Sequence, residues 1–99
     1  MIRPIVITRR AARQIEVARA WWYKHRHKAI FALDDEIEEA IAKIADTPHM
    51  APVARDIRMK GVRRMLLQTT QYHVYYREKF DAIEVVAFWH ASRGTPPRI

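Results

Sequence analysis

Apolar residues repeat at helical spacing along the first half of the chain. Ala11, Ile15, Ala18 and Trp22 fall on one stripe, and Thr8 precedes them as a suitable N-cap. A second, cleaner stripe contains Ile30, Leu33, Ile37, Ile41 and Ile44. The pattern predicts one helix that ends around Lys24 to Lys28 and another that stops at Thr47-Pro48. Because the connection between them is short, we expect an antiparallel helical hairpin.

The period changes to two from residue 57 onwards. This alternation predicts strands over residues 57–60, 62–68, 72–77 and 83–91, after a first strand over the mainly β-branched residues 2–8. Short loops make the later strands antiparallel neighbours. We therefore predict an α+β fold of the order β-α-α-β-β-β-β, in which an antiparallel β-sheet with an N-terminal strand carries the helical hairpin on one face. Residues 1–99 are expected to form a single domain, with 94–99 as a tail because Pro96-Pro97 cannot continue a strand.

Strand alternation also sorts the sheet residues into two faces, if Arg77 lies opposite Ala82 and Gln68 opposite Gln71. The face expected to pack on the helices is nearly all apolar and contains Met65, Leu67, Tyr72, Val74, Tyr76, Ile83, Val85, Ala87 and Trp89. The opposite face mixes cations, histidines and apolar groups, namely Arg64, Leu66, Gln68, His73, Tyr75, Arg77, Glu84, Val86, Phe88 and His90. That second face is too apolar for a plain solvent face, so it is a candidate binding surface.

The net charge of the chain indicates an acidic partner. The chain has 18 Lys and Arg against 11 Asp and Glu, a net charge of +7. Residues 31–50 carry most of the acids, and two basic segments flank them. The acidic run fits the solvated face of the second helix. A small and strongly basic protein is more often a partner of an acidic molecule than an enzyme for neutral metabolites.

Several classes of function are excluded or disfavoured. The chain has no cysteine, which excludes disulfides and thiolate metal sites and fits a reducing cytoplasm. No apolar run reaches the length of a membrane span, and the N-terminus does not resemble a signal peptide. His25 and His27 diverge on a helix, so we expect no metal site there. We also find no phosphate-binding glycine loop, no nucleophile elbow and no paired carboxylates, and we predict no cofactor.

Three stretches carry a resemblance to a known family. Residues 61–64 (Gly-Val-Arg-Arg), 72–77 (Tyr-His-Val-Tyr-Tyr-Arg) and 85–94 (Val-Val-Ala-Phe-Trp-His-Ala-Ser-Arg-Gly) resemble the RelE/ParE superfamily of toxins from type II toxin–antitoxin modules. The resemblance implies a toxin held inactive by a cognate antitoxin. ParE-like members inhibit DNA gyrase without chemistry of their own, whereas RelE-like members cleave mRNA on the ribosome without a metal. The first and last stretches are more similar to the ParE-like branch.

The nuclease alternative requires cations and a proton donor or acceptor. Metal-free RNA cleavage moves protons and stabilises a phosphorane. Arg58, Lys60, Arg64, Arg77 and Arg93 are candidate cations, and His90, His73 or Tyr75 is the candidate proton carrier. The resemblance implies the same roles for Arg58, Lys60, Arg64 and Arg93. A C-terminal tyrosine is common in RelE-like members, but no tyrosine follows Tyr76 here. Arginines on an antiparallel sheet also protect its edges without any catalytic role.

These observations lead to a prediction with two alternatives. We expect a ParE-like toxin that inhibits DNA gyrase and is neutralised by a cognate antitoxin. The alternatives are a RelE-like mRNA endonuclease that acts on the ribosome, and a basic nucleic-acid-binding domain without toxicity. No membrane partner is expected. The residues predicted to bind the antitoxin or the target are Trp21, Arg64, Leu66, His73, Tyr75, Arg77, Phe88, His90 and Arg93.

Overall fold

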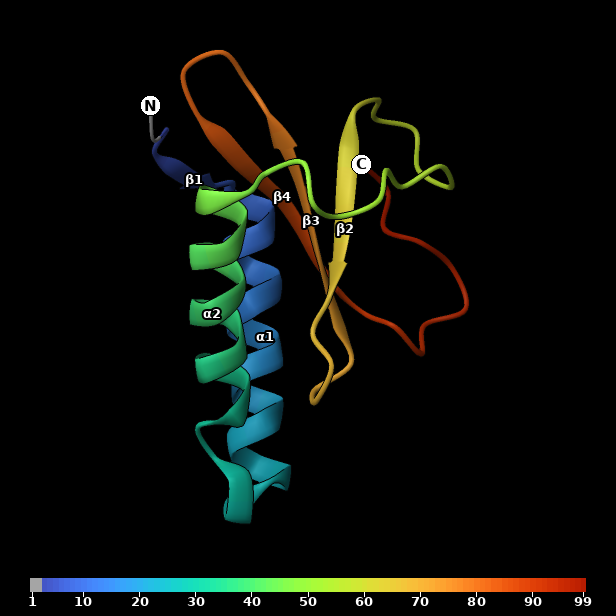
Figure 1. The fold of residues 1–99 in the computed structure, drawn as a ribbon. Helices are drawn as coiled ribbons and strands as arrows, with labels where there is room; N and C mark the ends of the chain where they lie inside the picture. Colours follow the sequence, from blue (N-terminus) through green and yellow to red (C-terminus); the bar gives the residue numbers. More distant parts are fainter. Residues whose placement is uncertain (1–2) are drawn as a thin grey trace.

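Two helices cover one face of a four-stranded sheet (Figure 1). A computed structural model describes residues 3–99, apart from the side chain of Lys28. The elements are β1 (Ile5–Ile7), α1 (Arg9–His25), a 3-10 turn (His27–Ala29), α2 (Ala32–Asp46), β2 (Val62–Leu66), β3 (Tyr72–Glu78) and β4 (Ile83–His90). The strands lie in the order β1-β4-β3-β2. This arrangement confirms the α+β fold with a helical hairpin on one face of the sheet.

The helical hairpin forms where the apolar stripes predict it. The Thr8 hydroxyl caps α1 by accepting a hydrogen bond of 3.1 Å from the Ala11 N–H. At the far end, the Trp22 ring donates to the Ala29 carbonyl at 2.7 Å and thereby fastens the connection between the helices. Arg19 of α1 forms an ion pair of 2.9 Å with Asp34 of α2. No helix among the described residues is long and apolar enough to cross a membrane.

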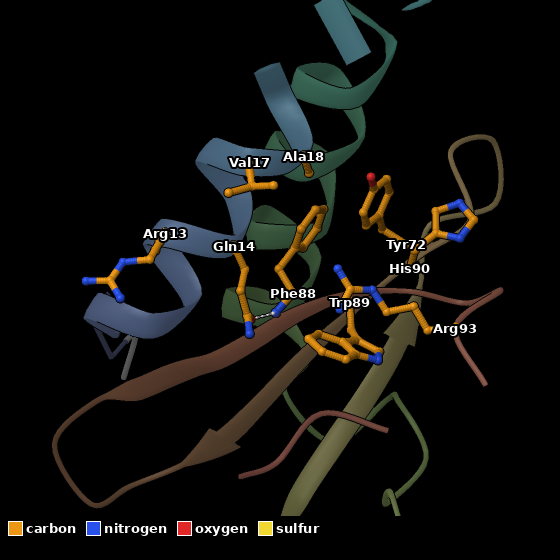
Figure 2. A pocket seen from close by; sticks show the side chains of 9 residues that line it. All are labelled: Arg13, Gln14, Val17, Ala18, Tyr72, Phe88, Trp89, His90 and Arg93. Atoms are coloured by element: carbon orange, nitrogen blue, oxygen red, sulfur yellow. Dashed lines mark hydrogen bonds between the residues drawn. The ribbon is translucent and has the colours of Figure 1, made fainter. Parts of the chain in front are cut away.

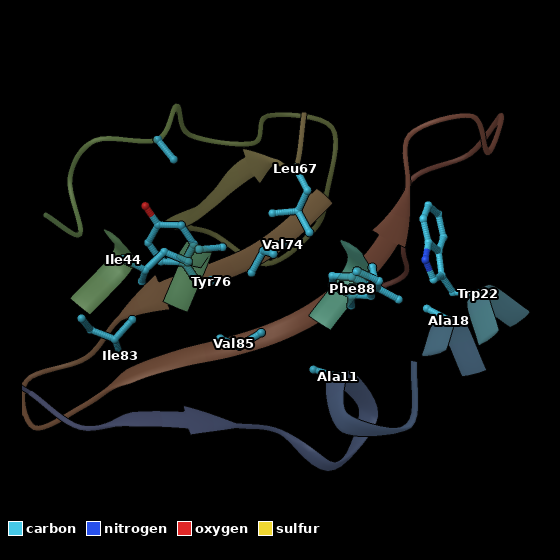
Figure 3. Packing of buried hydrophobic residues seen from close by; sticks show 13 residues of the cluster. Ala11, Ala18, Trp22, Ile44, Leu67, Val74, Tyr76, Ile83, Val85 and Phe88 are labelled. Carbon is cyan, nitrogen blue, oxygen red and sulfur yellow. The ribbon is translucent and has the colours of Figure 1, made fainter. Parts of the chain in front are cut away.

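The main core lies between the hairpin and the sheet (Figure 3). Its buried members include Leu33 and Ile44 from α2 and Tyr76 and Val85 from the sheet. Ile37 packs against this cluster but keeps partial exposure, whereas Ile41 is partly buried and does not belong to the residues packed against the cluster. The inward row of α2 is therefore Leu33, Ile37, Ala40 and Ile44, which corrects the expected position of Ile41.

Two strand predictions need correction. Residues 57–60 form bends and a turn instead of a strand, and the preceding segment makes an isolated bridge from Val53 to Arg63 of β2. The sheet is also mixed, because β1 pairs in parallel with β4, with Ile5 opposite Ile83. The connection is long enough for a parallel pair, because the whole hairpin and two further strands separate β1 from β4. Ile2, the start of the predicted first strand, lies outside the described residues.

The pairing of β3 with β4 shifts at Tyr75 and Tyr76, where β4 carries one extra residue, Val86, and this bulge determines which side chains face the helices at the end of β4. The register of β2 against β3 is as predicted, with Leu66 opposite His73. Between β3 and β4, however, Arg77 lies opposite Glu84 and the pairing shifts at the bulge, so that Val74 lies opposite Phe88. One extra residue exchanges the faces beyond it. Phe88 consequently packs in the main core, whereas Trp89 packs on the opposite face.

The opposite face of the sheet is covered and not open as predicted. A second cluster buries Ala54, Val62, Tyr75, Val86 and Ala87. Met59 from the connection after α2 and Ile99 from the C-terminal segment pack over it, and the Met59 N–H donates to the Ile99 carbonyl at 2.9 Å. The C-terminal segment runs along this side of the sheet (red in Figure 1). Sequence alternation detected the apolar character of the face but not the segments that cover it.

Candidate functional site

A cleft runs between α1 and the end of β4, where the exchanged strand residues meet the helix (Figure 2). Two adjoining hollows of about 260 and 540 Å³ form it, and both include Val17, Tyr72, His90 and Arg93. The turn at residues 69–71 closes one side. We call this feature the α1–β4 cleft.

Stacked rings form the floor and one wall of the cleft. The Tyr72 ring stacks on Phe88 at 4.7 Å between ring centroids, and the His90 ring meets Tyr72 edge-on at the same distance. Trp21 keeps 43% of its surface exposed, with its ring stacked on His25 at 4.5 Å. Aromatic rings held in place by their neighbours give contact area with little loss of side-chain entropy, which suits a binding surface.

The charge of the cleft is entirely positive. Arg13, Arg26 and Arg93 line it, and none of its described lining residues is Asp or Glu. The Arg26 guanidinium lies over the Trp21 ring at 5.2 Å from the centroid. Burial raises the pKa of the Tyr72 hydroxyl, although the nearby charge of Arg93 acts in the opposite direction. Tyr72 is thus a neutral, hydrogen-bonding phenol at physiological pH, and the cleft fits an anionic and partly apolar ligand.

Hydrogen bonds from backbone N–H groups to side chains fix the shape of the cleft. The Gln14 side-chain oxygen accepts a hydrogen bond of 2.8 Å from the Phe88 N–H, as Figure 2 shows, and this bond ties α1 to β4. The Ser92 N–H donates to Nδ1 of His90 at 3.1 Å, and the Ser92 hydroxyl lies 2.7 Å from the same nitrogen. These two contacts hold the orientation of the His90 ring at the edge of the cleft.

A second, smaller hollow of about 130 Å³ lies beyond β4, on the other face of the sheet. Its lining includes Arg64, His73 and Tyr75, together with His90 and Arg93 from the cleft side. We call it the Arg64 hollow. Arg64 is engaged there, because its guanidinium donates to both Asp56 oxygens at 3.1 and 3.2 Å and to the Tyr75 hydroxyl at 3.4 Å. Burial, with the charges of Arg64 and His90, lowers the pKa of His73.

The structure brings together some of the residues predicted as a site and separates others. Trp21, His90 and Arg93 line the α1–β4 cleft, and Phe88 lies beneath it with 3% of its surface exposed. Leu66 borders a different hollow near the start of the loop after α2. Arg77 forms an ion pair of 2.8 Å with Glu84. Arg58 and Lys60 lie in the connection before β2, and neither lines the Arg64 hollow.

The sequence analysis did not predict several residues of the cleft. Arg13, Val17 and Arg26 are among those that line it but stood outside the predicted set. A signal was present for Arg13 and Val17: with Trp21 and His25 they follow one another at four-residue spacing, which places them on one exposed row of α1. Tyr72 was assigned to the core, and it does pack there, but its other side faces the cleft.

The fold of this chain is similar to chains in solved structures of toxin–antitoxin systems. It superposes on a structure described as the chromosomal ParDE toxin–antitoxin system from P. aeruginosa with a TM-score of 0.74 at 18% identity, covering 92% of this chain and 98% of that chain. It also superposes on the E. coli DinJ-YafQ toxin–antitoxin complex with a TM-score of 0.62 at 11% identity, covering 91% of this chain and 93% of that chain. The fold is thus that of RelE/ParE-type toxins.

The family follows from the sequence itself. Residues 5–94 match the model of the ParE toxin of the type II toxin–antitoxin system parDE, and the chain therefore belongs to this toxin family. The comparison with curated proteins finds no match. Membership confirms the resemblance carried by residues 61–64, 72–77 and 85–94.

Proposed function

We propose that this ParE-family toxin acts in the cytoplasm by inhibiting DNA gyrase, and that a cognate antitoxin neutralises it by direct binding. The family match over residues 5–94 carries the proposal. The dispersal of the cationic side chains supports it: Arg77 is paired with Glu84, and Arg58 and Lys60 stand apart from Arg64. A toxin that acts by contact alone needs none of these groups to converge.

We assign the binding of the antitoxin or of the target to the α1–β4 cleft. The cleft offers an exposed Trp21 beside three arginines, and no carboxylate among its described lining residues balances their charge. An acidic segment with apolar side chains complements that surface in both respects. Such a segment gains apolar contact with Trp21 and Val17 and ion pairs with Arg26 and Arg93.

The test of the target is a supercoiling assay with purified gyrase. Relaxed plasmid, gyrase and ATP are incubated with increasing amounts of the toxin, and the loss of supercoiled product is measured. We expect inhibition by the wild type and relief on addition of the product of the adjacent antitoxin gene. Full supercoiling at every toxin concentration would exclude gyrase as the target.

The role of the cleft is tested by affinity for the antitoxin. We expect Trp21→Ala to weaken binding about 30-fold or more, as truncation of a central aromatic anchor does. Phe80→Ala is the matched control, because Phe80 is 99% exposed at the tip of the β3–β4 hairpin and remote from the cleft. Equal losses in the two variants would contradict the assignment of the cleft.

A RelE-like nuclease is the second candidate, and the Arg64 hollow is the observation that favours it. Arg64, His73, Tyr75, His90 and Arg93 line this one hollow, which combines cations with two imidazoles. A lowered pKa keeps His73 neutral and able to accept a proton near neutral pH. Ribosomes programmed with message and incubated with the toxin distinguish the candidates: codon-dependent cleavage that is lost in both His90→Gln and Arg93→Ala would replace the gyrase proposal.

A further inference from the structure

Five exposed arginines come together at one side of the molecule from three separate segments. Arg9, Arg10 and Arg13 lie on the first turns of α1, Arg58 in the connection before β2, and Arg98 in the C-terminal segment. The Arg10 guanidinium donates to the Arg98 carbonyl, and Arg58 and Arg98 line one hollow of about 430 Å³ with Met59 and Ile99. We call these five residues the arginine surface.

The five arginines of the arginine surface form no ion pair with the described carboxylates. The ion pairs within residues 3–99 involve Arg3, Arg19, His49, Arg64 and Arg77, and none involves the five arginines. The nearest acid along α1 is Glu16, one turn beyond Arg13, and it lies 3.9 Å from Arg19. Most other carboxylates lie on α2, so the molecule separates its charges between an acidic helix and a basic side.

The position of Arg9 and Arg10 works against the stability of the helix that carries them. They occupy the first turn of α1, and this turn contains no acidic residue. The positive end of the helix dipole repels cations there, whereas Asp or Glu at these positions would stabilise the helix. The Thr8 cap is otherwise well formed. Two arginines in the least favourable turn therefore indicate a requirement for surface charge and not for folding.

The chemistry of the arginine surface narrows its partner. Guanidinium groups pair with phosphate oxygens through two parallel hydrogen bonds, and a closely spaced group of them fits a polyanion. The hollow at Arg58 and Arg98 is completed by Met59 and Ile99, so its lining offers no aromatic ring on which an unpaired base could stack. Contact is thus directed at a phosphate backbone and not at bases.

We propose that the arginine surface binds the phosphate backbone of duplex DNA without sequence preference. The inference goes beyond the toxin's action on gyrase and stands without it, because it concerns DNA alone. It also separates two surfaces: the arginine surface for the duplex, and the α1–β4 cleft for a protein segment. Arg13 lies at their border, since it also lines the cleft.

The test is fluorescence anisotropy of a labelled duplex with the purified full chain at several salt concentrations. A duplex of about 20 base pairs, roughly 68 Å long at 3.4 Å per pair, exceeds the 40 Å longest dimension of the protein and leaves room for the whole surface to bind. The variant Arg9→Gln/Arg58→Gln/Arg98→Gln removes three charges from the surface. The matched control, Lys24→Gln/Lys43→Gln/Lys79→Gln, removes three charges from exposed positions elsewhere.

We expect the arginine variant to bind at least about 10-fold more weakly at low salt and to lose about 2–3 from the slope of log affinity against log salt concentration, since each phosphate contact contributes about 0.9. The lysine control should keep most of its slope. Thermal melting checks folding, and Arg9→Gln should not lower the midpoint because it relieves repulsion at the helix end. Equal losses in both variants, no binding by the wild type, or tighter binding to single-stranded RNA of equal length would each overturn the proposal.

Discussion

A carboxylate of α2 holds the turn that closes one side of the α1–β4 cleft. The Glu36 oxygens accept hydrogen bonds from the Thr69 N–H at 2.9 Å and the Thr70 N–H at 2.8 Å. Partial burial raises the pKa of Glu36, but these hydrogen bonds outweigh it and hold the pKa below its usual 4.5. The turn needs such support because Gln71, which follows it, has a positive φ of 64°.

The ionised form of Glu36 should therefore contribute stability that depends on pH. Its folded-state pKa is lowered, so the contribution is present above the unfolded pKa near 4.5 and is lost as the pH falls through the lower folded value. We expect Glu36→Gln to reduce the free energy of unfolding by about 1 kcal/mol at pH 7 and to flatten its dependence on pH below 4.5. Urea titrations at pH 7 and pH 3.5 measure both effects; parallel pH curves for the two proteins would contradict the role of Glu36.

His73 should act in a separate and higher pH range. Burial, Arg64 and His90 lower its pKa from the usual 6.5, so the unfolded chain takes up this proton more readily than the folded one. Stability associated with His73 is thus present above pH 6.5 and decreases as the pH falls through 6.5 towards the lower pKa of the folded state. We expect His73→Gln to remove this part of the pH dependence. Denaturant midpoints between pH 5 and 7.5 test it, and a slope unaltered by the substitution would show that His73 titrates normally.

At the scale of elements, the apolar stripe of α2 predicts the helix correctly but includes Ile41 in the buried row, where the structure has Ala40. Ile44 is fully buried in the main core, whereas Ile41 is only partly buried and does not belong to that cluster. We expect Ile44→Ala to destabilise the protein by about 2–5 kcal/mol and Ile41→Ala by clearly less. Thermal or urea unfolding of the two variants gives the ranking. A reversed order would mean that α2 is rotated about its axis relative to the sheet.

The limits of sequence-based prediction also appear at this scale. Thr8, the stripe to Trp22 and the stop at Thr47-Pro48 are local signals, and the helices form where those signals place them. The β3–β4 bulge has no comparable signal, because Tyr-Tyr at residues 75–76 and Val-Val at 85–86 read as continuous strand. Because this one extra residue was not recognised, Phe88 and Trp89 were each predicted on the wrong face of the sheet, and the cleft was not predicted.

At the scale of the whole molecule, the sheet is covered on both faces by different means. The hairpin covers one face, and the connection before β2 and the C-terminal segment together cover the other. The residue pattern along β2 to β4 predicted a second apolar face. The segments that cover this face are irregular and have no periodic pattern, so the sequence did not predict that they pack there. These segments carry Arg58 and Arg98. The segments that cover the second face thus also bring Arg58 and Arg98 to the arginine surface. Deletion of a segment should remove both the cover and the charge, whereas a point substitution of the arginine should remove the charge alone.

Deletion of residues 95–99 tests this coverage directly. The segment buries Pro97, packs Ile99 against the second cluster and accepts a 2.8 Å hydrogen bond at the Thr95 carbonyl from the Trp89 ring N–H. Its loss exposes apolar surface around Trp89 and Tyr75, and we expect the free energy of unfolding to fall by about 2–4 kcal/mol. Urea unfolding measures the loss, and binding of a hydrophobic dye reports the exposed face. Arg98→Gln in the full chain is the control, because it removes the charge and keeps the cover. If the deletion leaves the midpoint and the dye signal unchanged, the C-terminal segment does not stabilise the second face.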